Sequence, residues 1–458
     1  MRTVEIKQVN KNFYEVSKRD SIFIAPALEY EKVYWQQGKY RKEKKIYKAY
    51  FWEKTNEGNF RFLIGNLRRV TDYLKSKDIH YTVEKSQKAE VEIGKVKLFS
   101  IIPRSDQIRL IEKGLKKKQG LIISPTGSGK TVIAMGIISA LKKHNILFLA
   151  HTVDIVNQTT KRMIEELPEL KDKTQMLYGG NSNFLKNKSL TVSTVQTFSN
   201  LDFAKLKKHF TVIIIDEVHH VNAEKSQYGK ILKTLEAPYK LGFTATKNRE
   251  DKLKEMSCEG LLGPVIGTLS VKEAIEKGII SKPKIKLHKV PYNNKVSTMH
   301  GKYAEIYDSG IVLNEVRNNL IKETAEKYIR KNKSVLILVN RIEHGEILAD
   351  LLNAEFVRGE TDKETREYVQ KLLNKKEVMC VVATAVWKEG VDIPSVDVAM
   401  NAGGGKSEIQ TLQFIGRGFR RTEEKNTFIV VDFFDNSHKY FINHFGERLT
   451  LYFEMGWM

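Results

Sequence analysis

Short apolar runs alternate with segments of helical periodicity from Gly120 onward. The runs span residues 121–124, 146–150, 190–195, 212–215 and 241–243. Strands that are buried on both faces read as continuous apolar runs, and helical connections make neighbouring strands parallel. The pattern therefore predicts a parallel sheet covered by helices, with ligands bound at the carboxyl ends of its strands.

A second pattern of the same kind occupies the C-terminal part of the chain. Its apolar runs span residues 335–339, 356–357, 378–383, 396–400 and 428–432. Between the two patterns, Gly263-Pro264, Gly278 and Pro283 interrupt the periodicity, as expected of a crossover between domains. The fold class is therefore α/β, with parallel-sheet domains predicted over residues 96–280 and 281–458.

Residues 1–95 follow a different pattern, in which short β-type runs precede one amphipathic segment. The runs span residues 3–9, 13–16 and 46–52, a turn signal follows at Asn56-Glu57-Gly58, and residues 63–74 have helical periodicity. These elements predict a small α+β domain ahead of the two larger ones.

The chain carries a large positive charge. Its 77 Lys and Arg residues against 55 Asp and Glu residues give a net charge of +22 and a pI near 9.5. A surplus of this size favours a polyanionic partner, and nucleic acid is the first candidate. No apolar run approaches the roughly 18 residues of a membrane-spanning helix.

Cysteine and histidine spacings argue against a metal or disulfide framework. Cys258 and Cys380 lie far apart in the sequence. His219 and His220 are adjacent and lack the i, i+4 spacing of a helical zinc site. The N-terminal residues contain no hydrophobic signal core. We therefore expect a cytoplasmic protein without a structural zinc ion.

The stretch from Tyr30 to Trp52 interleaves aromatic and basic side chains. Positive charge neutralises phosphate, and flat rings stack on exposed bases. The alternative is an ordinary strand whose aromatic residues belong to a core and whose lysines form a solvated face. The basic residues assigned to nucleic acid are Lys39, Arg41, Lys42, Lys44 and Lys45.

A glycine-rich loop follows the first apolar run, because residues 124–131 read SPTGSGKT. Glycines allow a tight curl that points successive N–H groups at phosphate oxygens, and the following helix adds the partial positive charge of its N-terminus. Lys130 is predicted to reach the β- and γ-phosphates of ATP, and Thr131 to bind Mg²⁺. The predicted ATP contacts are Pro125, Thr126, Gly127, Ser128, Gly129, Lys130 and Thr131.

Two acidic residues follow the fourth apolar run directly. Asp216 is predicted to hold Mg²⁺ and Glu217 to orient the attacking water, since both stand at the carboxyl end of a buried strand. Upstream of the loop, the segment PRSDQ ends in Gln107. Because an amide can read the N6/N7 edge of adenine, we assign Gln107 to the nucleobase.

Polar side chains also end other runs of the first domain. Small hydroxyl groups there can hold a phosphodiester backbone without reading bases. The residues assigned to this role are His151, Thr152, Ser193 and Thr194. Helix capping is a strong alternative for Thr152 and Thr194. Thr244 and Thr246 follow the fifth run and are predicted to couple the nucleotide site to the nucleic-acid site.

SPTGSGKT, DEVHH and TAT occur in this order and resemble motifs I, II and III of the superfamily 2 DExH-type helicases and translocases. Residues 384–394 (TAVWKEGVDIP) resemble motif V, and residues 413–421 (QFIGRGFRR) resemble motif VI. The resemblance covers residues 100–458 and implies two RecA-like motor domains behind the small N-terminal domain.

The later motifs assign further residues by resemblance. Motif V places Gly390 and Asp392 toward the nucleotide. Motif VI supplies Gln413, Arg417 and Arg420, at i, i+4 and i+7 on one helix face, with the arginines as fingers for the γ-phosphate. A solvated basic helix face is the alternative for these arginines. The nucleic-acid contacts on this side of the chain are Asn340, Arg341 and Thr384.

The compact size and the basic N-terminal domain resemble the phage branch-migration helicases of the UvsW type. Arg249, in an Arg-Glu-Asp element after TAT, resembles the XPB-like motors and is assigned to coupling. The resemblance implies an ATP- and Mg²⁺-dependent DNA helicase that acts as a monomer on branched DNA, in the bacterial host cytoplasm if phage-encoded. The motor of a restriction-type translocase and a DExH RNA helicase are the alternatives.

Overall fold

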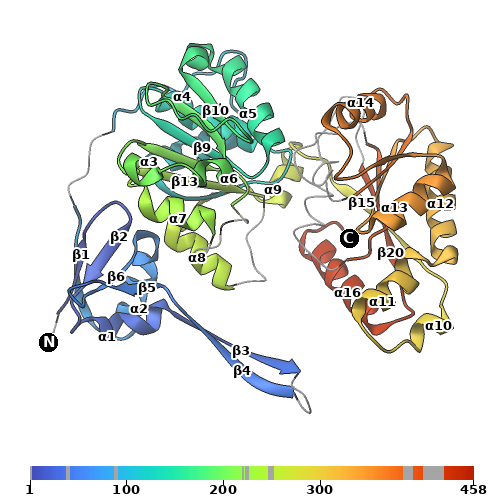
Figure 1. The fold of residues 1–458 in the computed structure, drawn as a ribbon, viewed down its shortest axis with the longest axis horizontal. Helices are drawn as coiled ribbons and strands as arrows, with labels where there is room; N and C mark the ends of the chain where they lie inside the picture. Colours follow the sequence, from blue (N-terminus) through green and yellow to red (C-terminus); the bar gives the residue numbers. More distant parts are fainter. Residues whose placement is uncertain are drawn as a thin grey trace. The chain divides into compact units, whose positions relative to one another are not determined.

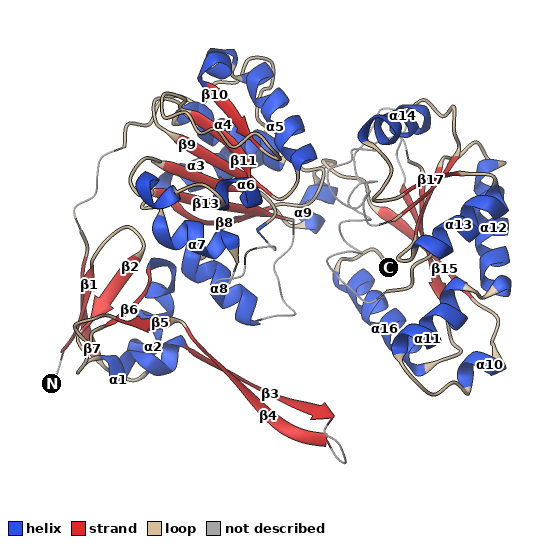
Figure 2. Cartoon of the chain, viewed as in Figure 1, coloured by secondary structure: helices blue, strands red, loops and turns tan. Residues whose placement is uncertain are grey.

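The computed structural model describes residues 3–37, 42–86, 91–218, 221, 226–245, 252–384, 396–405 and 428–458. The contacts divide the chain into two compact units. One comprises Met1–Ser124 with Gly129–Thr268, and the other comprises Pro125–Ser128 with Leu269–Met458. Figure 1 gives the course of the chain, and Figure 2 shows helices and strands.

The N-terminal module of the first unit is built on a mixed five-stranded sheet with the order β5-β6-β2-β1-β7. β3 and β4 pair only with each other, in an antiparallel ribbon that extends away from this sheet (Figure 1). The main elements are β1 (Thr3–Gln8), β2 (Phe13–Val16), α1 (Ser21–Ile24), β3 (Glu29–Gln37), β4 (Lys42–Tyr50), β5 (Trp52–Lys54), β6 (Phe60–Leu63), α2 (Leu67–Ser76) and β7 (His80–Glu84).

The rest of the first unit contains the first of the two predicted motor domains, and we keep the name motor domain 1 for it. Its sheet has seven parallel strands in the order β10-β11-β9-β12-β13-β8-β14. Its strands are β8 (Gln119–Ile123), β9 (Ile146–Ala150), β10 (Thr174–Leu177), β11 (Leu190–Thr194), β12 (Val212–Ile215), β13 (Tyr239–Thr244) and β14 (Val265–Thr268). Its main helices are α3 (Ser105–Lys117), α4 (Lys130–Ala140), α5 (Val153–Glu166), α6 (Val195–Ser199), α7 (Gln227–Thr234) and α8 (Lys252–Leu262).

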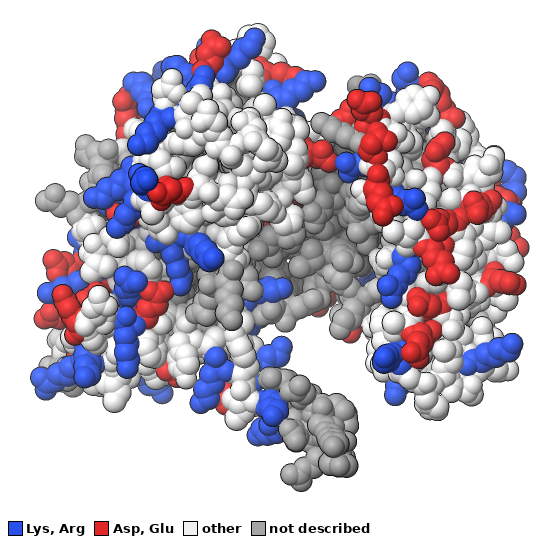
Figure 3. Space-filling model, viewed as in Figure 1, with Lys and Arg blue, Asp and Glu red and all other residues white. Residues whose placement is uncertain are grey.

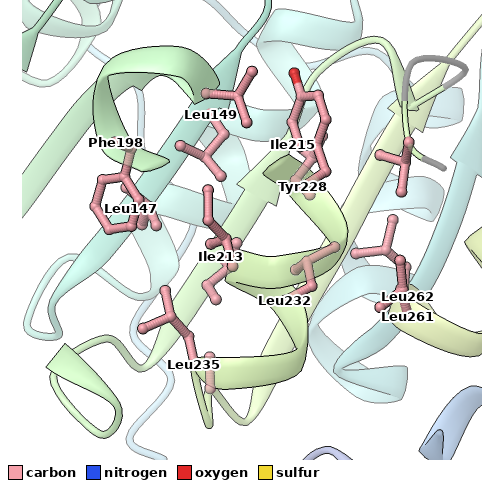
Figure 4. Packing of buried hydrophobic residues seen from close by; sticks show 14 of the residues in the cluster. Leu147, Leu149, Phe198, Ile213, Ile215, Tyr228, Leu232, Leu235, Leu261 and Leu262 are labelled. Atoms are coloured by element: carbon pink, nitrogen blue, oxygen red, sulfur yellow. The ribbon is translucent and has the colours of Figure 1, made fainter. Parts of the chain in front are cut away.

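Helices cover the sheet of motor domain 1, and apolar side chains fill the space between. Every residue of β9 and β12 is buried, as expected of strands that are covered on both faces. Figure 4 shows Leu147 and Ile213 packed with residues of the neighbouring helices, such as Phe198 and Leu232. The core thereby fixes the strand ends that carry the polar motifs.

The second unit contains motor domain 2, a six-stranded parallel sheet with the order β15-β20-β19-β16-β18-β17. Its strands are β15 (Pro283–Lys289), β16 (Val335–Leu338), β17 (Glu355–Val357), β18 (Cys380–Ala383), β19 (Val398–Asn401) and β20 (Phe428–Phe434). Its main described helices are α9 (Val271–Glu276), α10 (Asn294–Ser297), α11 (Tyr303–Tyr307), α12 (Glu315–Ile329), α13 (Ile342–Leu352), α14 (Lys363–Asn374) and α16 (Lys439–Glu454).

All ten apolar runs that predict strands in the two larger domains coincide with strands of the structure, so the α/β prediction is confirmed. In the module, the predicted helix over residues 63–74 begins only at Leu67, after a short 3-10 turn. Within this turn, Gly65 abuts the backbone of α8. A β-carbon there would lie 1.8 Å from the carbonyl oxygen of Glu259.

None of the helices in the described part of the chain combines the length and the apolar character that crossing a bilayer requires.

Candidate functional site

The phosphate loop curls between β8 and α4. Gly127 (φ +81°) and Gly129 (φ +91°) adopt left-handed backbone conformations that residues with a β-carbon rarely tolerate. Ser128 is buried, and its hydroxyl and its amide both donate to the carbonyl oxygen of Pro125, at 2.6 and 3.2 Å. α4 begins at Lys130, so its first N–H groups stand at the end of the loop, where they favour a phosphate group.

Gln107 is packed against this loop. Its side chain is 2% exposed, and its Oε1 accepts a hydrogen bond of 3.0 Å from the backbone N–H of Arg104. A β-carbon on Gly129 would lie 2.4 Å from Nε2 of Gln107, so the two residues are in direct contact. The structure thus brings Gln107 to the phosphate loop, and its reading of adenine stays a prediction.

The acidic pair stands at the carboxyl end of β12. Nζ of Lys130 lies 3.6 Å from Oε1 of Glu217. Glu217 has φ +51°, an uncommon conformation for a residue with a side chain, and strained backbone of this kind concentrates at functional sites. Its backbone N–H donates to Oδ1 of Asp216 at 3.0 Å. The loop lysine and both acidic residues therefore form one cluster.

Burial, together with the carboxylate of Glu217, raises the pKa of Asp216 to about 6, although the ammonium of Lys130 opposes the shift. Two crowded carboxylates of this kind favour a cation beside them. Among the described residues, no three His, Cys, Asp or Glu side chains gather into a preformed metal site. Mg²⁺ does not need such a cage, because it binds through one or two carboxylates, waters and substrate phosphates. Asp216 and Thr131 fit that requirement.

β13 lies between the two strands that lead to the nucleotide site. It pairs with β8, which precedes the phosphate loop, and with β12, which precedes Asp216. At its end, Thr244 is 5% exposed, and its carbonyl oxygen accepts a hydrogen bond of 3.0 Å from the N–H of Ser124. This backbone bond extends the pairing of β13 with β8 to the first residue of the loop motif, and the coupling role of Thr244 stays a prediction.

Capping accounts for two of the hydroxyls assigned to nucleic acid. Thr152 caps α5 and accepts from the N–H of Ile155 at 3.3 Å. Thr194 caps α6 and accepts from the N–H of Thr197 at 3.3 Å. Helix capping, the alternative that the sequence left open, therefore applies to both threonines. His151, next to Thr152, is half-buried.

Ser193 faces the protein interior. Its side chain is fully buried, and its hydroxyl donates to the carbonyl oxygens of Leu177 and Thr194, at 3.0 and 2.9 Å. This corrects the expectation of a nucleic-acid contact. The reason is that a run buried on both faces leaves even its last polar residues covered by neighbouring elements.

Motor domain 2 presents its predicted contacts at the carboxyl ends of its strands. Asn340 and Arg341 follow β16 and are exposed. Nδ2 of Asn340 donates to the carbonyl oxygen of Gly403 at 3.0 Å, and the guanidinium of Arg341 lies 5.9 Å from the ring centre of Tyr307. Thr384 is half-buried at the end of β18. These assignments stay predictions.

Ten predicted residues cannot be placed with their side chains. Nine lie outside the described residues: Lys39, Arg41, Thr246, Arg249, Gly390, Asp392, Gln413, Arg417 and Arg420. For Lys42 only the backbone is described, at the start of β4.

Lys44 and Lys45 are exposed on the ribbon, and Figure 3 shows Lys and Arg side chains gathered around its described part. Successive residues of a strand point to opposite faces. The register pairs Val33 with Ile46, which places Lys44 and Lys48 on one face and Lys32 and Lys45 on the other. The lysines therefore form two sets rather than one basic surface.

A buried lysine in motor domain 1 is not among the residues predicted from the sequence. Lys240 on β13 is 1% exposed, and its ammonium donates to Oδ1 of Asn12 and to the carbonyl oxygen of Leu232, the latter at 2.7 Å. Burial lowers the pKa of Lys240 to about 7. In the sequence, Lys240 could have been noticed as a charged residue within an otherwise apolar strand. The sequence does not indicate which residue it pairs with.

Comparisons with known proteins match both motor domains. Residues 100–249 match the family "Type III restriction enzyme, res subunit", and residues 316–422 match "Helicase conserved C-terminal domain". The first match contains the predicted motifs I to III. The second contains motifs V and VI, since motif VI ends at Arg421, inside the matched residues.

Two curated relatives cover most of the chain. The DNA 3'-5' translocase XPB2 of Sulfurisphaera tokodaii is 29% identical over 366 residues, which are 72% of this chain and 81% of the relative. The ATP-dependent DNA helicase uvsW of enterobacteria phage T4 is 24% identical over 400 residues, 82% of this chain and 79% of the relative. Other relatives are longer, and the chain spans 49% and 51% of two of them.

The fold also occurs in a fragment of a putative HsdR subunit of a type I restriction enzyme from Vibrio vulnificus. That structure has a TM-score of 0.59 and 17% sequence identity, and the match covers 92% of this chain and 93% of the fragment. At this identity the likeness concerns the fold alone.

Proposed function

We propose that this chain, which belongs to the superfamily 2 DExH-type helicases and translocases, is an ATP-driven motor that remodels branched DNA. Fork regression, branch migration and the unwinding of D-loops or R-loops are the reactions in this class. The observation that carries the proposal is the basic β3–β4 ribbon on a module joined to motor domain 1. A ribbon of this kind is suited to a position beside the duplex at a fork.

The nucleotide site supplies groups for phosphoryl transfer. Lys130 at the start of α4 holds the phosphates, and Glu217 orients the attacking water. Thr131 and Asp216 would hold Mg²⁺, which when bound neutralises charge on the transferred phosphate. The resemblance to motif VI assigns Arg417 and Arg420 as fingers for the γ-phosphate. The family implies the use of ATP, and these roles are our assignment to the residues.

DNA is the substrate that the curated relatives favour. The S. tokodaii relative is named a DNA translocase and the phage T4 relative a DNA helicase. The net charge of +22 is consistent with either nucleic acid. We therefore assign DNA from the relatives and the branched geometry from the ribbon.

ATPase measurements with a panel of nucleic acids test this proposal. We expect forked DNA and four-way junctions to stimulate turnover more than linear duplex, single-stranded DNA or RNA of equal length. Strongest stimulation by RNA would identify an RNA helicase instead. Turnover that no nucleic acid stimulates would contradict the motor function itself.

The ribbon gives a more local prediction. The register places Lys32, Lys45 and Tyr47 on one face, whereas on the opposite face Lys48 pairs with Glu31 at 3.3 Å. Replacing Lys32 and Lys45 with Ala should therefore flatten the slope of log affinity against log salt by about two units, because each phosphate contact contributes about 0.9. Fluorescence anisotropy with a forked DNA over a salt series measures this slope.

Lys44→Ala with Lys48→Ala is the matched control on the opposite face, with the same loss of charge. We expect it to change the slope by less than the first pair does. Equal slopes for the wild-type protein and both variants would mean that the ribbon lysines are a solvated surface. The module would then need another role, such as binding a partner protein.

A restriction-type translocase is the second candidate, favoured by the match of residues 100–249 to a restriction-enzyme subunit. Such a motor works with partner subunits that supply a nuclease. We propose instead that the chain acts alone and as a monomer. Remodelling of a fork by the purified chain, at a molecular mass near 52.7 kDa, would distinguish the two.

A further inference from the structure

The N-terminal module and motor domain 1 share their hydrophobic cores. Phe13 and Leu63 of the module pack into the core of motor domain 1. In the other direction, Met256 of α8 packs into the core of the module, with Leu253 against it. A tethered accessory domain would keep its own closed core, so the module is a built-in part of the motor domain.

A polar contact lies at the centre of this junction. Asn12, between β1 and β2, is 2% exposed, and both ends of its amide bind motor domain 1. Its Oδ1 accepts from the ammonium of Lys240, and its Nδ2 donates to the carbonyl oxygen of Lys233 at 2.8 Å. Buried polar groups need such partners, so separating the module would leave both Asn12 and Lys240 unsatisfied.

Ion pairs surround this contact. Nζ of Lys233 lies 2.8 Å from Oε1 of Glu53 on β5, whose Oε2 also accepts from Arg61 at 2.8 Å. On the next helix of the module, Arg69 pairs with Glu259 of α8 at 3.2 Å. These pairs are partly exposed and contribute less than the buried contact. They extend the junction over two further elements of the module.

Lys240 also stands on the strand that serves the nucleotide site. It is four residues before Thr244 on β13, the strand between those that lead to the phosphate loop and to Asp216. A strand rises about 3.3 Å per residue, so the contact with Asn12 lies roughly 13 Å from Thr244 along one rigid element. One strand thus connects the module to the loop motif.

We propose that Lys240 is a positioning residue, which through Asn12 fixes the module and its ribbon to β13, so that DNA held by the ribbon moves with motor domain 1 during each ATP cycle. This inference rests on the proposed function as a DNA motor. Lys240 contacts neither nucleotide nor DNA in this scheme. By holding the module in place, Lys240 allows ATP turnover to be coupled to DNA remodelling.

The test compares Lys240→Met, Asn12→Ala and the double variant in the full chain. Lys240→Met keeps the length of the side chain and removes its donors. We expect basal ATPase activity within about twofold of wild type, but a ratio of fork remodelled to ATP hydrolysed that falls about tenfold or more, the size of a coupling between contacting residues. The double variant should match the single variants, because all three lose the same contact.

Lys142→Met is the control, since Lys142 pairs with Glu169 within motor domain 1 and this pair does not involve the module. It should leave the ratio unchanged. A wild-type ratio in Lys240→Met overturns the proposal, and so does a loss in which basal ATPase, melting temperature and remodelling all fall in parallel.

Hydrogen exchange separates this inference from the proposed function. The N–H of Ile64 donates to the carbonyl oxygen of Asn12 at 2.9 Å. We expect its exchange to accelerate in Lys240→Met and in Asn12→Ala, whatever the nucleic-acid substrate is. If DNA did not stimulate ATP turnover of the wild-type protein, the proposed DNA motor function would be refuted. The exchange of the Ile64 N–H would still report whether Lys240 and Asn12 hold the module in place. Unchanged exchange in both variants would refute the docking role.

Discussion

Lys130→Ala should lower ATP turnover by about 10²–10³-fold or more, the cost of removing one preorganised charge-stabilising group from an active site. Lys130 begins α4 at the end of the phosphate loop and lies 3.6 Å from the carboxylate of Glu217. The substitution removes the predicted phosphate contact and leaves two neighbouring carboxylates without their cation. Steady-state ATPase assays at saturating forked DNA measure the loss.

DNA binding should survive the same substitution, because no predicted nucleic-acid contact involves Lys130. Anisotropy in the absence of nucleotide should give an affinity near that of the wild-type protein. Lys142→Ala is the control, since Lys142 follows the same helix and forms a surface ion pair with Glu169. Turnover near the wild-type rate in Lys130→Ala would contradict the assignment of the loop as the nucleotide site.

The strands that carry the site could be predicted from the sequence, whereas three of the four edge strands of the two larger sheets, β10, β14 and β15, could not. Central strands such as β12 are apolar throughout because both faces are covered. β14 and β15 are edge strands, and β15 alternates lysines with apolar residues. Half-exposed strands of this kind lack a continuous apolar run, so the sequence pattern did not reveal them.

The candidate nucleotide site could be proposed from the sequence because each of its parts is local in sequence. The loop from Pro125 to Lys130 is contiguous, and Asp216 and Glu217 directly follow one strand. The junction of the module could not be predicted, because Asn12 and Lys240 are 228 residues apart. Neither residue belongs to a motif. Only the fold shows that an asparagine in a β-turn region satisfies a lysine inside a sheet.

The junction also argues against testing the module by deleting it. With all motor motifs after residue 100, a fragment without the module would seem to be an intact motor. In the structure, removal of the module would expose the buried Lys240 and the apolar surface that Phe13 and Leu63 cover. Such a fragment would be destabilised for reasons unrelated to DNA, so point substitutions are the better test of the module.

Glu217→Gln should separate nucleotide binding from hydrolysis. Glutamine keeps the size and shape of the side chain but cannot accept a proton from the attacking water. Loss of a positioned general base costs about 10²–10⁴ in rate. Lys130 and Thr131 are unchanged in this variant, and we expect ATP to remain bound.

The prediction is therefore a low turnover rate with an ATP affinity near that of wild type, and an accumulation of ATP-bound complexes on forked DNA. A fluorescent ATP analogue measures the affinity, and single-turnover hydrolysis measures the chemical step. Glu169→Gln is the control, because Glu169, like Glu217, pairs with a lysine of the same unit. Its partner is Lys142, and this pair lies on the surface, away from the loop. If affinity and turnover fall together in Glu217→Gln, then Glu217 holds the nucleotide rather than the water. Wild-type turnover would mean that its left-handed conformation, at φ +51°, serves a purpose other than catalysis.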